Sequence, residues 1–436
     1  MSTFATLSLW GWPVACLAFF SQLPPRRAVL VCVIGGYLFL PMASISLGPF
    51  PSYGKFEAII LPALLLVCAF DADRFLRLRI RWPDAAVAGL VAIHFISSLA
   101  NGLGPGLMSG FEHVAVWGGA YLLGRAYFAD REGIANLAKA IVIGGLIYVP
   151  LCLYEVRMSP QLHHQIYGFH QHVFAQTRRF GGWRPVVFMQ HGLAVAYWMT
   201  AATLCAYWLW RTNSIRMFLG VRMAVWVAVL AGTTVLCKSI GALGLGVLGI
   251  TAMELARSTA PRLALAGLIA LVPAYAAGRM VAPDFSSTLI MDTVNSIPLI
   301  SERSGSLNHR LKSEDFLINR AEQQLLYGWN YRFNPKSVEG YGQATPDGLW
   351  VIMLGKYGLI GLICWMTMML AGPLMAVRQI PGRVLRSPRA APTVGLTVVI
   401  VLWTLDCMLN AMVNPVLIAA AGGLVGLPAE RRKPRP

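Results

Sequence analysis

The sequence predicts an all-α polytopic membrane protein, and both composition and hydropathy support that fold class. The chain of 436 residues is 56% hydrophobic and 13% charged, with a mean hydropathy of +0.60, which is too apolar for a soluble globular protein. Apolar runs of roughly 17–20 residues recur along the chain, each long enough to cross a bilayer as a helix. We count about thirteen runs and expect about 12–14 transmembrane helices in one integrated membrane domain.

The basic residues lie mainly in short loops between the apolar runs. The net charge is +17, and segments such as "DADRFLRLRIRWPD", "GRAYFADREG" and "VRQIPGRVLRSPR" fall on one side if the runs between them cross in pairs. Because positive charge in short loops marks the cytoplasmic side, it indicates topology and not a nucleic-acid partner. We therefore expect the N-terminus outside and the C-terminus, with its basic tail 429–436, in the cytoplasm.

Two longer segments are expected on the outer side, at 157–190 and 281–346. Both carry arginines although they face away from the cytoplasm, and long loops escape the positive-inside rule. In the second, "SLNHRLKSEDFLINRAEQQLLYGWN" has apolar residues near a helical period and Gly328 where a helix would stop. On this helix Arg310 and Glu314 share the face that leans toward the core. They are interpreted as an ion pair on a solvated helix or as part of a functional site.

Four outer cations are candidates for binding an anion. Arg184 stands between a tryptophan and a proline directly before an apolar run, and Lys238 occupies a very short turn between two such runs. Arg303 and Arg310 belong to the long outer segment. Guanidinium groups bind phosphate oxygens through two parallel hydrogen bonds, so the set predicts a phosphate or pyrophosphate site. For Lys238, the alternative is a side chain that extends to the membrane interface.

Three other groups of polar residues are interpreted as structural. The eight cysteines lie within or beside apolar runs without CxxC spacing, and the histidines of "LHHQIYGFHQH" match no familiar zinc spacing. Asp406, Asn410 and Asn414 are interpreted as hydrogen-bonding groups between helices, with a proton path as the alternative. The paired acidic residues of a divalent-metal site are also lacking, so we predict no metal and no cofactor.

The central part of the chain resembles the O-antigen ligase and O-antigen polymerase family of bacterial envelope proteins. The resemblance rests on "VLCKSIGALGLGVLGI", then "SGSLNHRLKSEDFLINRAEQQLLYGWN", then "TPDGLWVIMLGKYGLIGL", in that order. In the family, a short "SRGA"-like turn precedes two helices, and an arginine-bearing loop helix leads into a "GWG"-like turn and a "G..G" signal. "RFGGWRPVVFMQHG" is similar to the upstream arginine motif of the family.

The resemblance implies a metal-independent, inverting glycosyltransferase with a fold of the membrane-embedded GT-C type. Such an enzyme transfers a glycan from an undecaprenyl-pyrophosphate donor to a hydroxyl of a saccharide acceptor, at the outer face of the bacterial inner membrane. By the same resemblance, Arg184 and Arg303 hold the pyrophosphate and Arg310 is a further candidate. This sequence departs from the family at the short turn, where Lys238 and Ser239 replace the usual arginine arrangement. Other polysaccharide export components are expected as further partners.

The general base is the second place where the sequence departs from the family. Family ligases often have a His-Asn pair where this chain has Asp347 and Gly348. An aspartate there is a candidate for accepting the proton of the acceptor hydroxyl. The alternative is that Asp347 caps the N-terminus of the following helix. His191 and Glu314 are the rival candidates for the base.

Three functions are compatible with these residues. The first is a polysaccharide polymerase, for an O-antigen or an exopolysaccharide, and the second is a ligase that transfers the glycan to lipid A core. The third is a transporter or flippase, since an arginine-lined cavity also binds a lipid-linked glycan without chemistry. Transporters often have two similar halves. The absence of an internal repeat in the sequence therefore favours an enzyme.

Overall fold

The computed structural model is almost entirely helical. It describes residues 2–48, 50–102, 110–111, 113–258, 260–296, 304–333 and 344–428. The chain is 76% helical, and the strands among the described residues form three two-stranded antiparallel hairpins, β1–β2, β3–β4 and β5–β6. These findings confirm the predicted all-α class. The predicted basic tail at 429–436 lies outside the described residues.

Eight described helices are long and apolar enough to cross a membrane, so the chain is a multi-pass membrane protein. They are α1 (Thr3–Gln22), α6 (Trp82–Ala100), α9 (Arg131–Met158), α11 (Gly192–Arg211), α13 (Ile240–Arg257), α14 (Pro261–Val281), α18 (Leu349–Gln379) and α20 (Ala391–Asp406) with the 3-10 turn η6 (Pro388–Ala390) before it.

Shorter apolar segments account for the other runs counted in the sequence. They are α2 (Pro25–Leu30), η1 (Val31–Gly35) and α3 (Gly36–Phe39) as one continuous helix, α4 (Lys55–Phe70), η2 (Val114–Gly119) continuing into α8 (Ala120–Tyr127), α12 (Met223–Leu236) and α21 (Pro415–Gly426). The number of these segments that cross a membrane stays a prediction.

The remaining elements connect the apolar helices. They are β1 (Ser44–Leu47), β2 (Phe50–Gly54), α5 (Asp73–Leu76), α10 (Leu162–Tyr167), η3 (Phe174–Thr177), β3 (Arg178–Arg179), β4 (Gly182–Trp183), β5 (Met217–Phe218), β6 (Val221–Arg222), α15 (Pro283–Asn295), α17 (Ser304–Glu322), η4 (Asn330–Arg332) and α19 (Gly382–Leu385). Helix α17 confirms the helix predicted in the long outer segment. That helix ends at Glu322, and Gly328 follows in the left-handed region with a φ of 68°.

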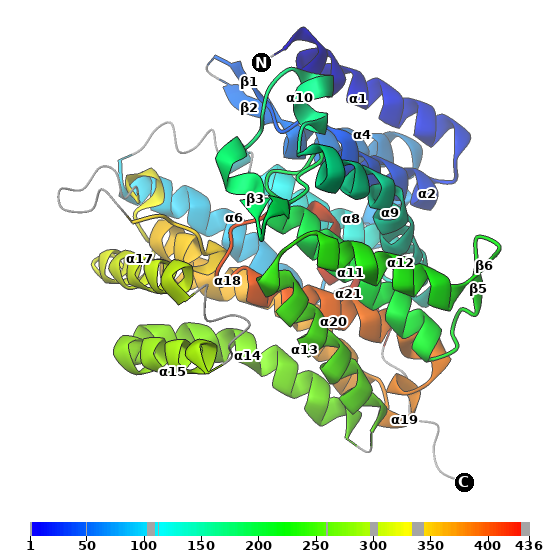
Figure 1. The fold of residues 1–436 in the computed structure, drawn as a ribbon. Coiled ribbons are helices and arrows are strands. Elements are labelled where there is room, and N and C mark those ends of the chain that lie inside the picture. Colours follow the sequence, from blue (N-terminus) through cyan, green and yellow to red (C-terminus); the bar gives the residue numbers. More distant parts are fainter. Residues whose placement is uncertain are drawn as a thin grey trace.

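The connections gather at two ends of the helix bundle. At one end, which we call the basic end, Arg26 pairs with Asp130, and Arg262 donates to the carbonyl of Ile380 at 3.1 Å. Hairpin β5–β6 and α19 also lie there (Figure 1). At the opposite end, which we call the site end, lie α15 and α17 (Figure 1). The described loops that the sequence predicts as cytoplasmic thus come together at one end.

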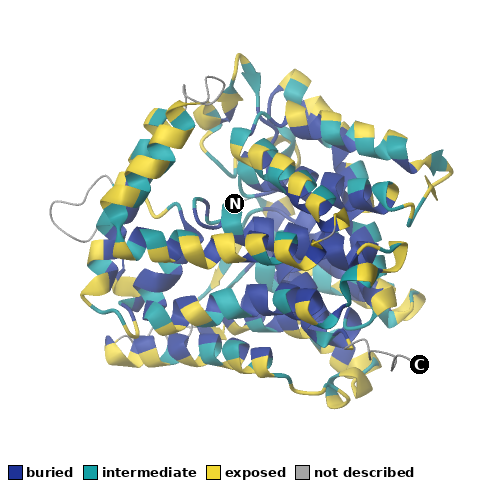
Figure 2. Ribbon diagram, turned by 90° about the horizontal axis from the view of Figure 1, so that it is seen from below, coloured by how far each residue is buried: buried dark blue, intermediate teal, exposed yellow. Residues whose placement is uncertain are grey.

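The core is formed by α11, α20 and α21, whose side chains are buried over nearly their whole length. Figure 2 shows the buried residues gathered in the interior of the helix bundle. Helix α21 packs closely on α8 because glycines stand at the contact. A Cβ at Gly124 would overlap the carbonyl oxygen of Ala419, and one at Gly422 would overlap the carbonyl oxygen of Tyr121. Small residues let backbones approach inside a membrane, where dispersion contacts hold helices together.

Helix α18 is broken by Gly358, which has a φ of 66° and a ψ of −167°. The backbone of the segment after α17 approaches this break, where the N–H of Leu359 donates to the carbonyl of Leu325 at 2.6 Å. The N–H of Trp329 donates to the carbonyl of Gly355 at 2.8 Å. The break and the turn at Gly328 therefore dock the arginine-bearing helix α17 on α18.

Replacing Gly422 by alanine is expected to lower the thermal stability of the protein. The added methyl group meets the Tyr121 carbonyl, so α8 and α21 must separate and lose contacts. Gly267→Ala is the matched control, because Gly267 lies in helix α14 with open space around it and alanine favours a helix by about 0.5–1 kcal/mol. Unfolding midpoints of the purified proteins in detergent measure this. Equal midpoints for the two variants would contradict it.

Candidate functional site

A cavity of about 470 Å³ at the site end is lined by segments that are far apart in the sequence. Three arginines line it, namely Arg179, Arg184 and Arg310. Asp406 and Asn410, at and after the end of α20, line the same space. Much of the remaining lining is apolar and follows α13, with Gly241, Gly244, Leu245 and Leu248. The cavity thus combines positive charge with an apolar surface.

Arg184 is held by the turn that contains Lys238. Its side chain is largely buried, and its guanidinium donates to the Lys238 carbonyl at 3.0 Å. Lys238 has a φ of 51°, in the left-handed region, and its ammonium donates to the Phe180 carbonyl at 3.4 Å. Ser239 follows and lines the cavity. Lys238 therefore joins the two loops at the rim of the cavity, and its predicted contact with pyrophosphate stays a prediction.

The segment 184–191 runs without helix or strand through a largely buried position. Non-helical backbone needs partners inside the protein when it lies away from water. Glu155 supplies them from the end of α9. One of its carboxylate oxygens accepts from the N–H groups of Val186 and Val187 at 2.7 and 2.8 Å, and the other accepts from Leu162 at 3.0 Å. This carboxylate fixes the loop that carries Arg184.

Replacing Glu155 by alanine is expected to destabilise the protein by several kcal/mol, since each buried N–H group left without an acceptor costs about 1–3 kcal/mol. Glu132→Ala is the matched control in the same helix, because its side chain is 79% exposed. Thermal unfolding in detergent measures the difference. A Glu155→Ala protein as stable as the control would show that the carboxylate does not hold the loop.

Arg310 connects helix α17 to the segment after α20. Its guanidinium donates to the carbonyl of Leu409 and to the side-chain oxygen of Asn410, both at 3.1 Å. Its Nε lies 3.5 Å from a carboxylate oxygen of Asp347. Asn410 in turn donates to Asp406 at 2.8 Å. Arg310 therefore forms its ion pair with Asp347. One of the two interpretations of this helix paired Arg310 with Glu314, and that interpretation is wrong.

Asp347 does not cap helix α18, contrary to one of the two roles considered for it. The N-cap residue is Gly348, and it makes no side-chain capping bond. Instead, the first N–H groups of the helix donate to the backbone carbonyls of Asn410 and Cys407 at 3.2 and 3.3 Å. The carboxylate of Asp347 is 42% exposed and lies beside Arg310. It is thus available to a molecule that enters the site.

Glu314 is enclosed by donors from two other helices. Its carboxylate accepts from the Tyr275 hydroxyl at 2.9 Å and from the Trp350 indole, and it lies 3.3 Å from the Nε of Arg279. Arg279 is fully buried and also pairs with Asp315. Burial raises the pKa of Glu314 to about 7, although Arg279 acts against this shift. These contacts fit a carboxylate that positions α17.

The raised pKa of Glu314 predicts a pH-dependent stability. The folded protein favours the protonated form, so the contribution is complete below the ordinary pKa of 4.5 and is lost as the pH rises through about 7. Glu314→Gln cannot ionise and should flatten the decrease in unfolding midpoint between pH 4.5 and 8. Glu322→Gln, exposed on the same helix, is the control. An unchanged pH profile for Glu314→Gln would rule out this origin.

His191 caps helix α11 and is surrounded by positive charge. Its Nδ1 accepts from the N–H of Leu193 at 2.9 Å, which assigns the ring proton to Nε2. Burial lowers the pKa of His191 to about 3, and the neighbouring His172 and Arg184 lower it further. A ring in this state is a poor proton acceptor. It is a neutral donor beside the arginines.

The structure brings together most of the residues predicted for the site. Arg184 and Arg310 line the main cavity, while Glu314 and Asp347 line a small adjoining cavity with Arg310. Arg303 lies outside the described residues. The predicted roles in binding and catalysis stay predictions.

Three residues of this region were not predicted. Arg179 belongs to the stretch that carries Arg184; it pairs with Gly182 in hairpin β3–β4 and lines the cavity. Arg279 and Glu155 are charged residues near the ends of apolar helices, and charge within such a run is the signal that could have identified them. Asn414 caps α21 by accepting from Val416 at 3.1 Å, so it acts within its own segment.

The described residues contain no group of three or more His, Cys, Asp or Glu side chains that is arranged to hold a metal ion. No protein-family model matches the chain, and no curated protein matches it. The fold and the site therefore define a class, namely an all-α, multi-pass membrane protein with an arginine-lined cavity at one end.

Proposed function

We propose that this protein is a glycosyltransferase that builds a polysaccharide at the outer face of the bacterial inner membrane. It transfers a glycan from an undecaprenyl-pyrophosphate donor to a hydroxyl of a saccharide acceptor. The observation that carries the proposal is the cavity lined by Arg179, Arg184 and Arg310 together with the apolar surface of α13. A pyrophosphate attached to a polyprenyl chain requires positive charge and an apolar surface in the same site.

The proposal places the site end outside and the basic end in the cytoplasm, with the N-terminus outside. The positive-inside rule supports this orientation, because the short basic loops gather at the basic end. The proposal also includes a fold of the membrane-embedded GT-C type.

In the proposed reaction, the acceptor hydroxyl attacks the anomeric carbon from the side opposite the pyrophosphate. A new glycosidic bond forms, the bond to the pyrophosphate oxygen breaks, and the configuration is inverted. Undecaprenyl pyrophosphate leaves with the electron pair, and Arg184 and Arg310 stabilise its charge without a metal. The hydroxyl proton passes to Asp347, whose carboxylate lies beside Arg310.

Asp347 is the best placed of the three candidate bases. Its carboxylate is partly exposed, whereas that of Glu314 is enclosed by Tyr275, Arg279 and Trp350. His191 uses the lone pair of Nδ1 in a helix cap. In the proposed mechanism, Glu314 is a positioning residue and His191 is a hydrogen-bond donor near the pyrophosphate.

Replacing Arg184 or Arg310 by lysine should reduce product formation about 10- to 100-fold, since lysine keeps the charge and loses the planar fork. Arg216→Lys is the control, an exposed arginine before hairpin β5–β6 at the basic end. The assay is purified protein with an undecaprenyl-linked oligosaccharide, read out as product length. A ladder indicates a polymerase, and transfer to lipid A core indicates a ligase. Uptake into vesicles without product would indicate a transporter and overturn the proposal.

Asp347→Asn should lower the rate about 10²- to 10⁴-fold, because an amide cannot accept the proton. The side chain does not cap α18, so the exchange leaves the helix N-terminus unchanged. Glu322→Gln serves as the matched control on the surface of α17. If Asp347→Asn made product at a near-normal rate, the base would have to be sought at His191 or Glu314.

A further inference from the structure

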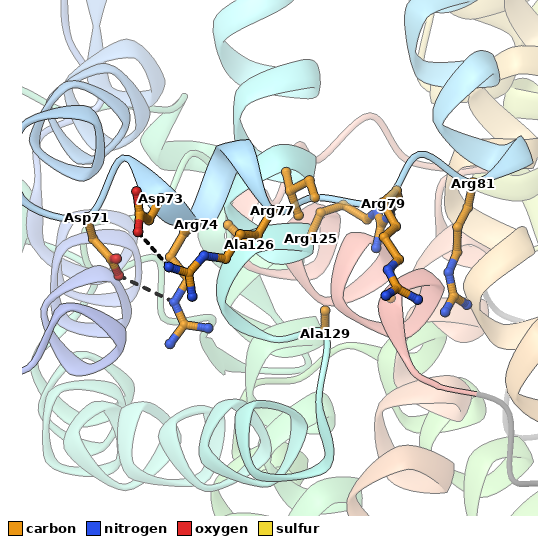
Figure 3. A pocket seen from close by; sticks show the side chains of 11 residues that line it. Asp71, Asp73, Arg74, Arg77, Arg79, Arg81, Arg125, Ala126 and Ala129 are labelled. Carbon is orange, nitrogen blue, oxygen red and sulfur yellow. Dashed lines mark hydrogen bonds and ion pairs between the residues drawn. The ribbon is translucent and has the colours of Figure 1, made fainter.

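A second cavity, of about 490 Å³, lies at the basic end and has no part in the proposed reaction. It is formed by the connection between α4 and α6, by the end of α8 and by the end of α21. Five arginines line it, as Figure 3 shows. They are Arg74, Arg77, Arg79, Arg81 and Arg125.

The acidic side chains near this cavity compensate part of its charge. Asp73 pairs with Arg77 at 2.7 Å, and Asp84 pairs with Arg125 at 3.0 Å. Arg74 has a looser partner in Asp71, at 3.4 Å. None of these three ion pairs involves Arg79 or Arg81.

Arg79 and Arg81 carry the excess charge. Arg79 is exposed, and no ion pair joins it to any other residue that the structure describes. The guanidinium of Arg81 donates to the uncharged carbonyls of Val425 and Leu427, at 2.9 and 3.0 Å. Burial lowers the pKa of Arg81, and the nearby charges of Arg125 and Arg79 lower it further, whereas Asp84 acts against this shift. An anion in the cavity would relieve this repulsion.

Apolar side chains stand out beside the same arginines. In "RLRIRW", Ile80 is 90% exposed and Trp82 is 60% exposed, and Leu76 in the preceding turn is 82% exposed. This connection joins the ends of two apolar helices, so it lies at the level where a bilayer meets water. There the apolar side chains enter the acyl region while the guanidinium groups stay at the level of the headgroups.

We propose that the cavity at the basic end binds the phosphate headgroup of an anionic phospholipid, with Arg79 and Arg81 as its main contacts. Phosphate oxygens match the guanidinium groups, and basic pockets between membrane helices bind such headgroups. A soluble polyphosphate shares this chemistry but would leave Leu76, Ile80 and Trp82 in water. The bound lipid joins the α4–α6 connection to the end of α21. The proposal stands independently of the proposed enzymatic activity.

The test is native mass spectrometry of the full-length protein in detergent, titrated with phosphatidylglycerol against phosphatidylcholine. Arg79→Gln with Arg81→Gln removes the two arginines proposed as the main contacts. Each arginine near an anionic headgroup strengthens binding about fivefold, so the double variant should bind phosphatidylglycerol roughly 25-fold more weakly. Arg216→Gln with Arg222→Gln removes the same charge from hairpin β5–β6 and should change binding less than about twofold.

Three results would overturn the proposal. Equal losses in the two double variants would show attraction to surface charge alone, and equal binding of phosphatidylcholine would exclude headgroup recognition. Displacement of the lipid by millimolar inorganic pyrophosphate would identify a soluble anion as the ligand. Ile80→Ser provides an independent measurement that keeps every arginine. It should weaken phosphatidylglycerol binding, and retained lipid affinity would contradict a lipid ligand.

Discussion

The site depends on one constraint, which is that buried backbone groups away from water need partners within the protein. Segment 184–191 is largely buried without forming a helix, so its N–H and carbonyl groups need hydrogen-bond partners within the protein. Glu155 accepts from Val186 and Val187, and the buried ammonium of Lys55 donates to the Phe188 carbonyl at 2.8 Å. These contacts fix the loop, and the loop places Arg184 at the cavity.

The same constraint shapes the other side of the site. The N-terminus of α18 donates to carbonyls of the segment after α20, so this segment is held against α18. Arg310 donates to the same segment through Leu409 and Asn410. Since the backbone caps the helix, Asp347 stays beside Arg310 with its carboxylate partly exposed. These backbone contacts thus leave the carboxylate of Asp347 available to a ligand.

Charges play different roles in the interior and in the cavities. Arg279 is fully buried and is compensated by Glu314 and Asp315, which attaches α17 to α14 and α15. Breaking such a pair is costly because a buried charge is left alone. In the two cavities, Arg184 and Arg81 donate to uncharged carbonyls, whereas Arg310 and Arg77 pair with exposed carboxylates. At both ends the charge lies beside apolar surface, which favours a ligand with a phosphate and a lipid part.

Hydropathy and loop charge alone determined the helical class, the grouping of basic loops and the helix at α17, because these depend on local composition and period. The sequence also singled out Arg184, Arg310 and Asp347, since charges beside apolar runs are conspicuous. Tertiary structure decided their partners. Asp347 pairs with Arg310 instead of capping α18, and Glu314 meets Arg279 instead of Arg310. Such contacts join residues far apart in the chain, and the packing of the helices sets which of them meet.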